Sequence, residues 1–370
     1  MTLRGDRKKV LWLSKGLDRG GVEILLEELA WHTALRDFDL HVASVLTRHL
    51  QMGSNFESAG VTVHDLGGQS NIDTTWVFNL WRLLKQERFD VIHSHSPLPA
   101  AAVRLLSGRP KWRNPLLLST EHSARCLYHP ATRVLNDVTA RMDDRRFAVS
   151  QAAADACTRF DRRPIEVVYH GRSRVPVVQG ERDRLRSTLG IEGSDTAVFC
   201  IANMRPEKNL GLLVRAFARA NSRATSPMRL VMIGDGQCRP GIESLVDDLE
   251  LRQSVTMLGS QPEARQWLPA ADILALSSDV EGLPVVIMEA LQAGVAIVAT
   301  RVGGIPEVVS SGREGILVAP GNETELSLAM SRLANDRQLL AAFSASALQT
   351  SGRFSVEPAA QRLALIYAQN

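Results

Sequence analysis

Two glutamates in the stretch SSDVEGLPVVIMEALQAG (277–294) stand where a carboxylate needs hydrogen-bond donors. Glu281 precedes a Gly-Leu-Pro turn, and Glu289 follows after seven intervening residues, inside an apolar run. A carboxylate in apolar surroundings needs hydrogen-bond donors, and the hydroxyls of a sugar or a ribose diol provide them. We therefore expect both acids to bind hydroxyl groups. The alternative for Glu289 is a cap or a salt bridge inside the fold.

The residues between the two acids indicate an anion site at the start of a helix. Pro284 fits the first helical position, because its missing N–H would have no partner there. The amides of Leu283, Val285 and Val286 would then be free to bind phosphate or sugar oxygens. Gly282 needs only to be small.

Two other loops carry residues that suit a diphosphate. Gly20 and Gly21 follow an apolar run and precede a helical pattern, so the backbone there can approach an anion closely. Arg205 and Lys208, in IANMRPEKNLGLL, stand where a strand gives way to a helix and would neutralise negative charge. A tight turn without a ligand and solvated surface charges remain the alternatives.

The elements that position these loops repeat along the whole chain. Short β-branched runs alternate with helical patterns such as residues 22–35 and 212–220. The runs are VLWLS (10–14), LHVASVL (40–46), VTVHDL (61–66), DVIHS (90–94), LLLST (116–120), IEVVYH (165–170), AVFCIA (197–202), RLVMIG (229–234), VTMLG (255–259), DILALS (272–277), AIVAT (296–300) and GILVA (315–319). This alternation predicts an α/β protein with two doubly wound, Rossmann-like domains. Ligands bind beyond the carboxyl ends of such strands, which is where the residues above lie.

The composition is that of an ordinary globular protein. Of the 370 residues 45% are hydrophobic, and the net charge of +3 is too small to indicate nucleic-acid binding. The four cysteines have no metal-binding or redox spacing, so we expect reduced thiols. No run reaches the roughly 20 apolar residues that a membrane span requires. We expect a cytoplasmic protein that either stays in solution or touches a membrane surface.

The pattern EGLPVVIMEAL–AG–VAT–VGGIPE resembles that of the retaining, nucleotide-sugar-dependent glycosyltransferases of the GT-B fold, of the group 1 or family 4 type. Further motifs in the family's order extend the resemblance over nearly the whole chain. They are RGGVE (19–23), HSHS (93–96), STEHS (119–123), MRPEKNLGLLVRAF (204–217) and IGDG (233–236). The resemblance implies two domains facing each other across a cleft. It also implies transfer of a sugar, of hexosyl type, from a nucleoside diphosphate sugar with retention at the anomeric carbon.

The resemblance also implies roles for the donor-side residues. Glu281 would contact the donor sugar as a catalytic group, and Glu289 would hold the ribose. Lys208 would neutralise the diphosphate, beside which Gly20 and Gly21 would lie. Stabilisation of the departing diphosphate would then be the main electrostatic contribution to the rate.

Histidines and one departure from the family pattern complete the predicted site. His122 matches a catalytic-site histidine that lies close to the donor sugar and the acceptor; the alternative is a structural bond at a strand end. His93 and His95 share one face of a strand, so they line the site or pack in the core. Relatives carry an arginine where this chain has Asn203, so either Arg205 or helix amides would supply the second diphosphate contact.

The resemblance implies a domain at residues 1–175 for the acceptor, one at 176–352 for the donor, and a helix at 353–370 that crosses back. We expect no cofactor besides the donor. We also expect no metal, because the acid pairs 143–144 and 247–248 are interpreted as charges on helix surfaces. The departing phosphate would itself take the acceptor's proton.

Alternative functions and the acceptor remain open. A GT-B sugar-nucleotide epimerase and a non-catalytic partner subunit share the fold, although the donor-site residues present here favour an active transferase. The acceptor would be a glycan, a lipid-linked glycan or a small molecule, as in polysaccharide or glycoconjugate biosynthesis. The basic stretch RLLSGRPKWR (104–113) is either a contact with anionic lipid or a solvated loop.

Overall fold

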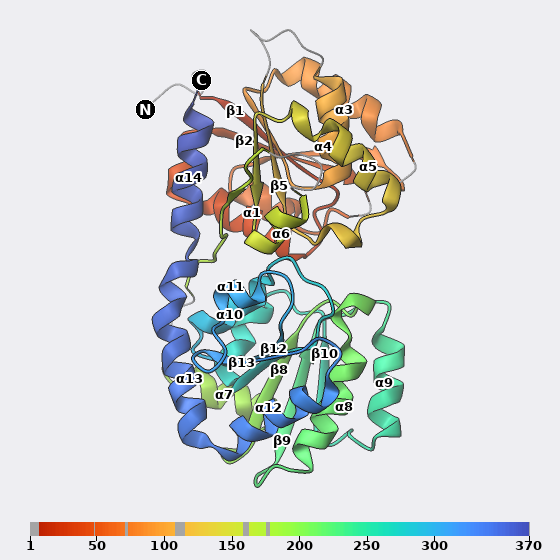
Figure 1. The fold of residues 1–370 in the computed structure, drawn as a ribbon. Helices are drawn as coiled ribbons and strands as arrows, with labels where there is room; N and C mark the ends of the chain where they lie inside the picture. The colour runs from red at the N-terminus through yellow and green to blue at the C-terminus, as the bar shows by residue number, and fades with distance from the viewer. Residues whose placement is uncertain are drawn as a thin grey trace. The chain divides into compact units, whose positions relative to one another are not determined.

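The computed structural model describes residues 7–47, 49–70, 73–107, 115–157, 163–174 and 178–369. The chain forms two compact units (Figure 1). The first unit comprises residues 1–173 and 355–370, and the second comprises residues 174–354. The division lies two residues before the boundary expected from the sequence, and the last sixteen residues belong to the first unit.

Within the described residues of the first unit, seven parallel strands form one sheet in the order β3-β2-β1-β4-β5-β6-β7. The strands are β1 (Lys9–Ser14), β2 (Asp39–Leu46), β3 (Thr62–Gly68), β4 (Val91–Ser94), β5 (Leu116–Glu121), β6 (Arg145–Ala148) and β7 (Glu166–Val167). The sequence did not indicate β6, because two arginines open it and no apolar run results.

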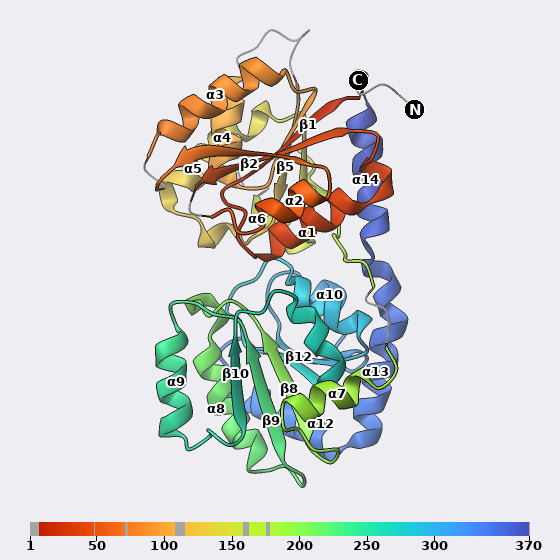
Figure 2. The ribbon, with the colours of Figure 1, turned by 180° about the vertical axis from the view of Figure 1, so that it is seen from behind.

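Helices cover both faces of this sheet (Figures 1 and 2). They are α1 (Gly21–Trp31), α2 (Gly53–Ser58), α3 (Thr75–Glu87), α4 (Pro97–Leu106), α5 (Pro130–Thr139), α6 (Gln151–Cys157) and α14 (Val356–Ala368). Val10 and Trp12 of β1 join a core with α1, α2 and α14, whereas Leu11 and Leu13 face a second core with α3 and α4. Alternate residues of one strand thus fill two cores, as expected for a sheet buried on both sides.

The carboxy-terminal helix α14 is part of the first core. The Trp12 indole donates to the Tyr367 hydroxyl at 3.0 Å, and that hydroxyl lies 2.7 Å from His93 Nδ1. Burial raises the pKa of Tyr367 above its ordinary value, so the phenol stays neutral. Helix α14 therefore contributes both apolar side chains and a buried hydrogen bond to the first core.

The second unit repeats the architecture. Within its described residues, six parallel strands follow the order β10-β9-β8-β11-β12-β13. They are β8 (Thr196–Ile201), β9 (Met228–Ile233), β10 (Val255–Gly259), β11 (Ile273–Leu276), β12 (Ala296–Thr300) and β13 (Gly315–Val318). The helices are α7 (Glu181–Thr188), α8 (Leu210–Asn221), α9 (Arg239–Asp248), α10 (Val285–Gln292), α11 (Ile305–Val308), α12 (Glu323–Asn335) and α13 (Arg337–Thr350).

Both sheets confirm the predicted doubly wound α/β class. In each, the strand order reverses between the first strand and the fourth, at β1/β4 and at β8/β11. Ligands of such folds bind at this switch point, just beyond the carboxyl ends of the strands. The loops after β1, β4, β8 and β11 are therefore the places to look for a site.

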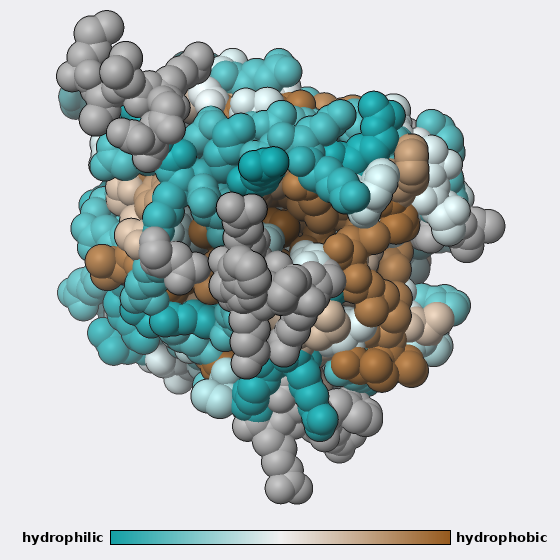
Figure 3. Space-filling view, turned by 90° about the horizontal axis from the view of Figure 1, so that it is seen from above, coloured by the Kyte–Doolittle hydropathy of each residue, from teal (hydrophilic) through white to brown (hydrophobic). Residues whose placement is uncertain are grey.

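Large apolar side chains lie exposed on the surface of the first unit. Among the residues that the structure describes, no helix combines the length and apolar character needed to cross a bilayer. Figure 3 shows apolar surface gathered on one side of the view. Exposed large apolar side chains of the first unit include Phe78 and Trp81 of α3, Leu105 of α4, and Val134 and Val138 of α5.

Candidate functional site

Lys208 and Glu281 form an ion pair at the switch point of the second unit. Lys208 Nζ lies 2.7 Å from Glu281 Oε1 and 2.8 Å from Oε2. Ser278 Oγ also donates to Oε1 at 2.6 Å. Glu281 is 8% exposed, and the lysine side chain is 21% exposed. The structure thus brings together a predicted sugar-binding acid and a predicted phosphate-binding cation, and it pairs them.

The pairing follows from the way in which the loops after β8 and β11 are joined. Ser277 Oγ lies 2.9 Å from the carbonyl oxygens of Lys208 and Asn209. The amide of Asp279 donates to the Glu207 carbonyl at 2.9 Å, and the Asn209 side chain donates to the Asp279 carboxylate. These bonds fix the backbone on either side of the pair.

A third loop, after β12, packs against the Glu281 turn. Gly303 has a φ of +52°, and a Cβ there would lie 2.2 Å from the Glu281 carbonyl oxygen. The Gly304 amide donates to the Gly282 carbonyl at 2.6 Å, and Thr300 Oγ1 donates to the Ser278 carbonyl at 2.6 Å. The VGGIPE motif therefore shapes the Glu281 turn, because only glycine combines this backbone angle with this contact.

The GDG segment after β9 supports the other side of the site. A Cβ at Gly234 would lie 2.0 Å from the Ala202 carbonyl oxygen, and one at Gly236 would lie 2.6 Å from that of Met204. The Met204 amide donates to the Asp235 carbonyl at 2.8 Å. The motif thus fixes the start of the loop that carries Lys208, a role that its glycines alone did not reveal in the sequence.

The helix that carries Glu289 begins one residue later than predicted. Pro284 is the N-cap of α10, with an extended ψ of 122°, and Val285 is the first helical residue. The amides of Val285 and Val286, in the first turn, lack acceptors within the helix, as at any helix start. Glu289 is buried on the same helix and is 8% exposed. Its predicted contact with a ribose stays a prediction.

Other predicted donor-binding residues lie in the loop before α8 and at the start of α1. Arg205 and Asn203 are both exposed, in the loop before α8. Gly20 is the N-cap of α1 with an ordinary extended φ of −129°, and Gly21 opens the helix. A Cβ at Gly20 would meet the movable end of the Glu23 side chain. The backbone conformation therefore does not require glycine at position 20, which leaves close approach of a ligand as the predicted reason.

His93 belongs to the core of the first unit. It is fully buried, with Nδ1 at 2.7 Å from the Tyr367 hydroxyl and Nε2 at 2.7 Å from Thr120 Oγ1. Both ring nitrogens thus have protein partners. The sequence left open whether His93 lines the site or packs in the core, and the structure supports packing in the core.

His95 and His122 lie together beyond β4 and β5. His95 Nδ1 lies 3.0 Å from His122 Nε2, and the His170 ring centroid lies 5.6 Å from that of His122. Burial, helped by the neighbouring imidazoles, holds the pKa values of His95 and His122 well below the usual range. Burial lowers the pKa of His170 to about 4. These rings are therefore neutral near pH 7.

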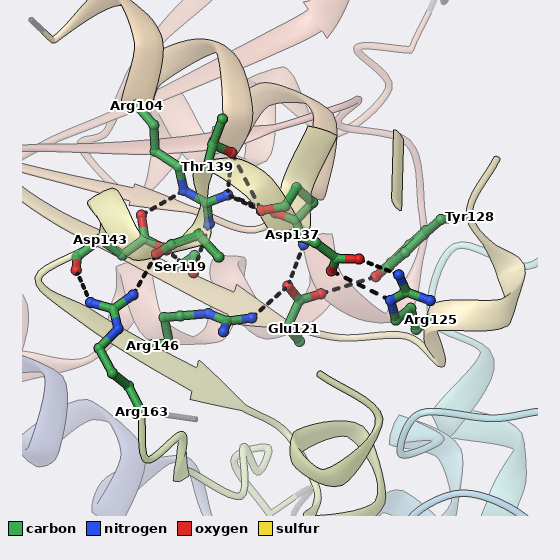
Figure 4. A network of polar contacts seen from close by, with 12 residues as sticks. Arg104, Ser119, Glu121, Arg125, Tyr128, Asp137, Thr139, Asp143, Arg146 and Arg163 are labelled. Atoms are coloured by element: carbon green, nitrogen blue, oxygen red, sulfur yellow. Dashed lines mark hydrogen bonds and ion pairs between the residues drawn. The ribbon is translucent and has the colours of Figure 1, made fainter. Parts of the chain in front are cut away.

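A buried polar network includes Ser119 and Glu121 of β5 (Figure 4). Arg104 donates to both oxygens of Asp143, at 2.7 and 2.6 Å, and Ser119 Oγ donates to the same carboxylate at 2.6 Å. Glu121 accepts from Asn136 Nδ2 at 3.1 Å. Asp143 is 4% exposed, so its interpretation as a helix-surface charge was wrong. No local pattern indicated that Asp143 is buried, because its partner Arg104 is 39 residues away in the chain.

The network also bears on the predicted lipid contact. Arg104, the first basic residue of the stretch 104–113, is 1% exposed and bound to Asp143, so it is not available to a membrane. Residues 108–113 lie outside the described residues. The predicted contact with anionic lipid therefore has no support from Arg104.

Within the described ranges, no group of three or more histidine, cysteine, aspartate or glutamate side chains is arranged to hold a metal ion.

The free cysteines of the described chain are Cys126, Cys157, Cys200 and Cys238. Burial raises the pKa of the Cys157 and Cys200 thiols to about 12. Those two thiols are therefore unreactive, as expected for packed cysteines.

Comparison with known proteins gives related matches for both units. Residues 181–350 match the family model of the glycosyl transferases group 1, and residues 19–173 match that of Glycosyltransferase Family 4. N-acetyl-alpha-D-glucosaminyl L-malate synthase of Bacillus anthracis is 25% identical over 86% of this chain and 86% of its own length. A D-inositol 3-phosphate glycosyltransferase of Streptomyces bingchenggensis is 26% identical over 95% of this chain and 85% of its own length.

Solved structures agree on the fold. Anabaena HepE, crystallised with UDP and glucose, superposes with a TM-score of 0.85 at 22% identity and covers 98% of this chain and 100% of its own. Sucrose-phosphate synthase of Thermosynechococcus elongatus superposes with a TM-score of 0.83 at 17% identity, over 98% and 99% of the two chains. The two family models together span most of the sequence, and the chain belongs to the group 1 glycosyltransferases, enzymes of the GT-B fold.

Proposed function

We propose that this glycosyltransferase moves a sugar from a nucleoside diphosphate sugar to a hydroxyl acceptor with retention at the anomeric carbon and without a metal ion. The observation that carries the proposal is the Lys208–Glu281 pair at the β8/β11 switch point. Nucleotides bind at such points in doubly wound sheets. The relatives whose names mention glycosyl transfer, and a structural neighbour crystallised with UDP and glucose, support a nucleotide-linked donor.

The proposed chemistry at Lys208 follows from its hydrogen-bonding capacity. An ammonium group has three N–H donors, and Glu281 occupies two of them in this structure. The third would donate to the donor's diphosphate, with the first-turn amides of α10 nearby in the same unit adding further donors. Stabilising the departing diphosphate lowers the barrier, because negative charge develops there as the glycosidic bond to phosphate breaks.

In the proposed step the bond between the anomeric carbon and the phosphate oxygen breaks, and the acceptor oxygen bonds to the same face of that carbon. The acceptor's proton passes to the departing phosphate oxygen, so charge and atoms balance without a separate base. Glu281 would accept hydrogen bonds from donor-sugar hydroxyls, Glu289 would accept them from the ribose diol, and His122 would contact the substrates as a catalytic residue.

The test is release of nucleoside diphosphate by the purified chain from uridine-, guanosine- and adenosine-linked sugars, preceded by a thermal-shift screen of the same compounds. The correct donor raises the melting temperature by mass action. Lys208→Met should reduce kcat/KM by about 100-fold or more, the size of effect seen when one electrostatic donor is removed. Arg252→Met, which removes an exposed cation of the same unit, is the matched control and should leave turnover unchanged.

Other outcomes would assign other functions. Failure of every donor to bind or react would favour a non-catalytic partner subunit. Interconversion of free nucleotide sugars without an acceptor would identify an epimerase. A product whose anomeric configuration, read from the coupling constant of its anomeric proton, is opposite to that of the donor would refute retention. Loss of turnover in EDTA, with recovery on adding a divalent cation, would refute metal independence.

A further inference from the structure

His95 and His122 form a pair of imidazoles whose shared hydrogen bond has a direction that can be worked out. His95 follows β4 and His122 follows β5, and these strands are neighbours. His95 Nδ1 lies 3.0 Å from His122 Nε2. His95 is 3% exposed, whereas His122 keeps a partly exposed side chain.

A neutral imidazole carries one hydrogen, so one ring donates and the other accepts. The Nε2 atom of His95 is buried and has no hydrogen-bond partner among the described residues. If His122 donated, His95 would bear its hydrogen on that buried Nε2, as an N–H without an acceptor. If His95 donates, only a lone pair is left there. Orphaned buried N–H groups are the rarer and costlier case, so His95 is the donor.

The direction of this bond decides what His122 offers to a ligand. Because His122 Nε2 accepts, the hydrogen of its neutral ring is on Nδ1. Among the described residues Nδ1 of His122 has no hydrogen-bond partner, and the side chain is partly exposed, so this N–H is open to a substrate.

We propose that His95 is a positioning residue that fixes His122 as the Nδ1–H tautomer, so that His122 acts on the substrates as a neutral hydrogen-bond donor and not as a base. The assignment rests on the proposed function only in that His122 touches the substrates there. A ring nitrogen with a fixed hydrogen suits an oxygen acceptor, such as a sugar hydroxyl or a phosphate oxygen.

The neighbouring imidazoles do not compete for the same hydrogen bond. His170 Nδ1 lies 3.0 Å from the Val168 carbonyl, which can only accept, so the His170 hydrogen is committed to that bond. His93 has both nitrogens engaged, with Tyr367 and Thr120. His95 is therefore the described ring that donates to His122.

The tautomer can be measured directly in the full chain. With 15N-labelled histidine, two-bond 1H–15N correlations separate a ring nitrogen that bears hydrogen from one that does not, and His122→Gln assigns the His122 signals. We expect hydrogen on Nδ1 and none on Nε2 in the wild-type protein. This readout needs no substrate.

Three substitutions at position 95 test the cause. His95→Asn places an amide nitrogen near the position of Nδ1 and can still donate. His95→Asp has the same shape but offers only an acceptor, and His95→Leu offers neither. We expect Asn to keep the His122 tautomer and kcat/KM within about 3-fold, and Asp to move the hydrogen to Nε2 and lower kcat/KM by about 10-fold or more, as lost positioning contacts typically do.

A second imidazole pair in the same unit is the control. His41 Nδ1 lies 2.8 Å from His64 Nε2, so His41→Asn repeats the change at another site and should not alter the His122 signals. Hydrogen on Nε2 of wild-type His122, or equal effects of Asn and Asp at position 95, would overturn the proposal. Expected tautomers in a chain that consumes no donor would support the His95 assignment and refute the proposed function.

Discussion

Replacing Gly303 with alanine should disable the site through the backbone of the Glu281 turn. Its φ of +52° lies in the left-handed region, where an L-residue is less stable by about 1–2 kcal/mol. The new Cβ would also lie 2.2 Å from the Glu281 carbonyl oxygen and 2.9 Å from that of Gly282. Ordinary carbon contacts begin at about 3.5 Å, so the turn must move by more than about 1 Å.

The structure supplies controls that separate strain from collision. Gly312 and Gly321, in the same unit, have φ values of +91° and +75°, and a Cβ at either would meet nothing within 4 Å. Alanine at these two positions should cost only the strain of about 1–2 kcal/mol. Alanine at Gly303 should cost about 2–5 kcal/mol, because overpacking adds about 1–3 kcal/mol.

The assay combines stability with turnover. Urea-dependent hydrogen exchange, followed by mass spectrometry of peptides from residues 178–354, gives the free energy of unfolding of this unit. Nucleoside diphosphate release gives kcat/KM, which should fall by about 100-fold in Gly303→Ala, since a misplacement of 1 Å has an effect of that order. The kcat/KM of Gly321→Ala should stay close to that of the wild-type protein. If Gly303→Ala matched Gly321→Ala in both measurements, the argument that this glycine positions Glu281 would be refuted.

Further predictions concern the first unit. Arg104→Met should destabilise it by about 3–5 kcal/mol in urea unfolding, because the buried Asp143 carboxylate loses its cationic partner, and adding Asp143→Asn should restore part of the loss. His170 has a folded pKa of about 4, below its unfolded value, so stability should fall as pH drops from about 6.5 toward 4, at about 1.4 kcal/mol per pH unit for this group. His170→Gln should remove that share of the slope; an unchanged slope would contradict it. Iodoacetamide at pH 8 should label exposed Cys126 and spare buried Cys157 until the chain unfolds, and equal labelling of the two would refute the packed assignment.

Most of the fold could be predicted because it rests on local patterns. A strand buried on both faces reads as a short continuous apolar run, and AVFCIA and DILALS correspond closely to β8 and β11. β6 could not be found in this way. The buried Arg146 is tolerated in this strand because it lies within 3.8 Å of Glu121, at the end of the neighbouring β5. Such a contact exists only after the sheet has formed.

The sequence predicted which residues belong to the candidate site, but not the bonds among them. Motif spacing predicted Lys208 and Glu281 in loops at strand ends, but Glu281 lies 73 positions after Lys208, and nothing local indicates that they pair. The buried Arg104–Asp143 contact, the GDG support of the Lys208 loop and the His95–His122 bond have the same origin. Each joins residues of different strand-end loops or helices, so each depends on the strand order and not on sequence spacing.

The Lys208–Glu281 pair also bears on the proposal that Lys208 binds phosphate, because a carboxylate beside that cation would weaken its attraction for an anion. A lysine side chain alone has several rotatable bonds, and ordering it on binding would cost about 1.5–2 kcal/mol. Two bonds to Glu281, itself held by Ser278 and by the Gly303 turn, order the lysine beforehand and leave one N–H directed by geometry. If Lys208 binds the diphosphate as proposed, part of the donor affinity is exchanged for a fixed position of charge, which would benefit the step in which charge develops more than it benefits binding. Glu281→Gln should therefore lower kcat more than it raises KM, and the opposite split would show that the acid serves binding alone.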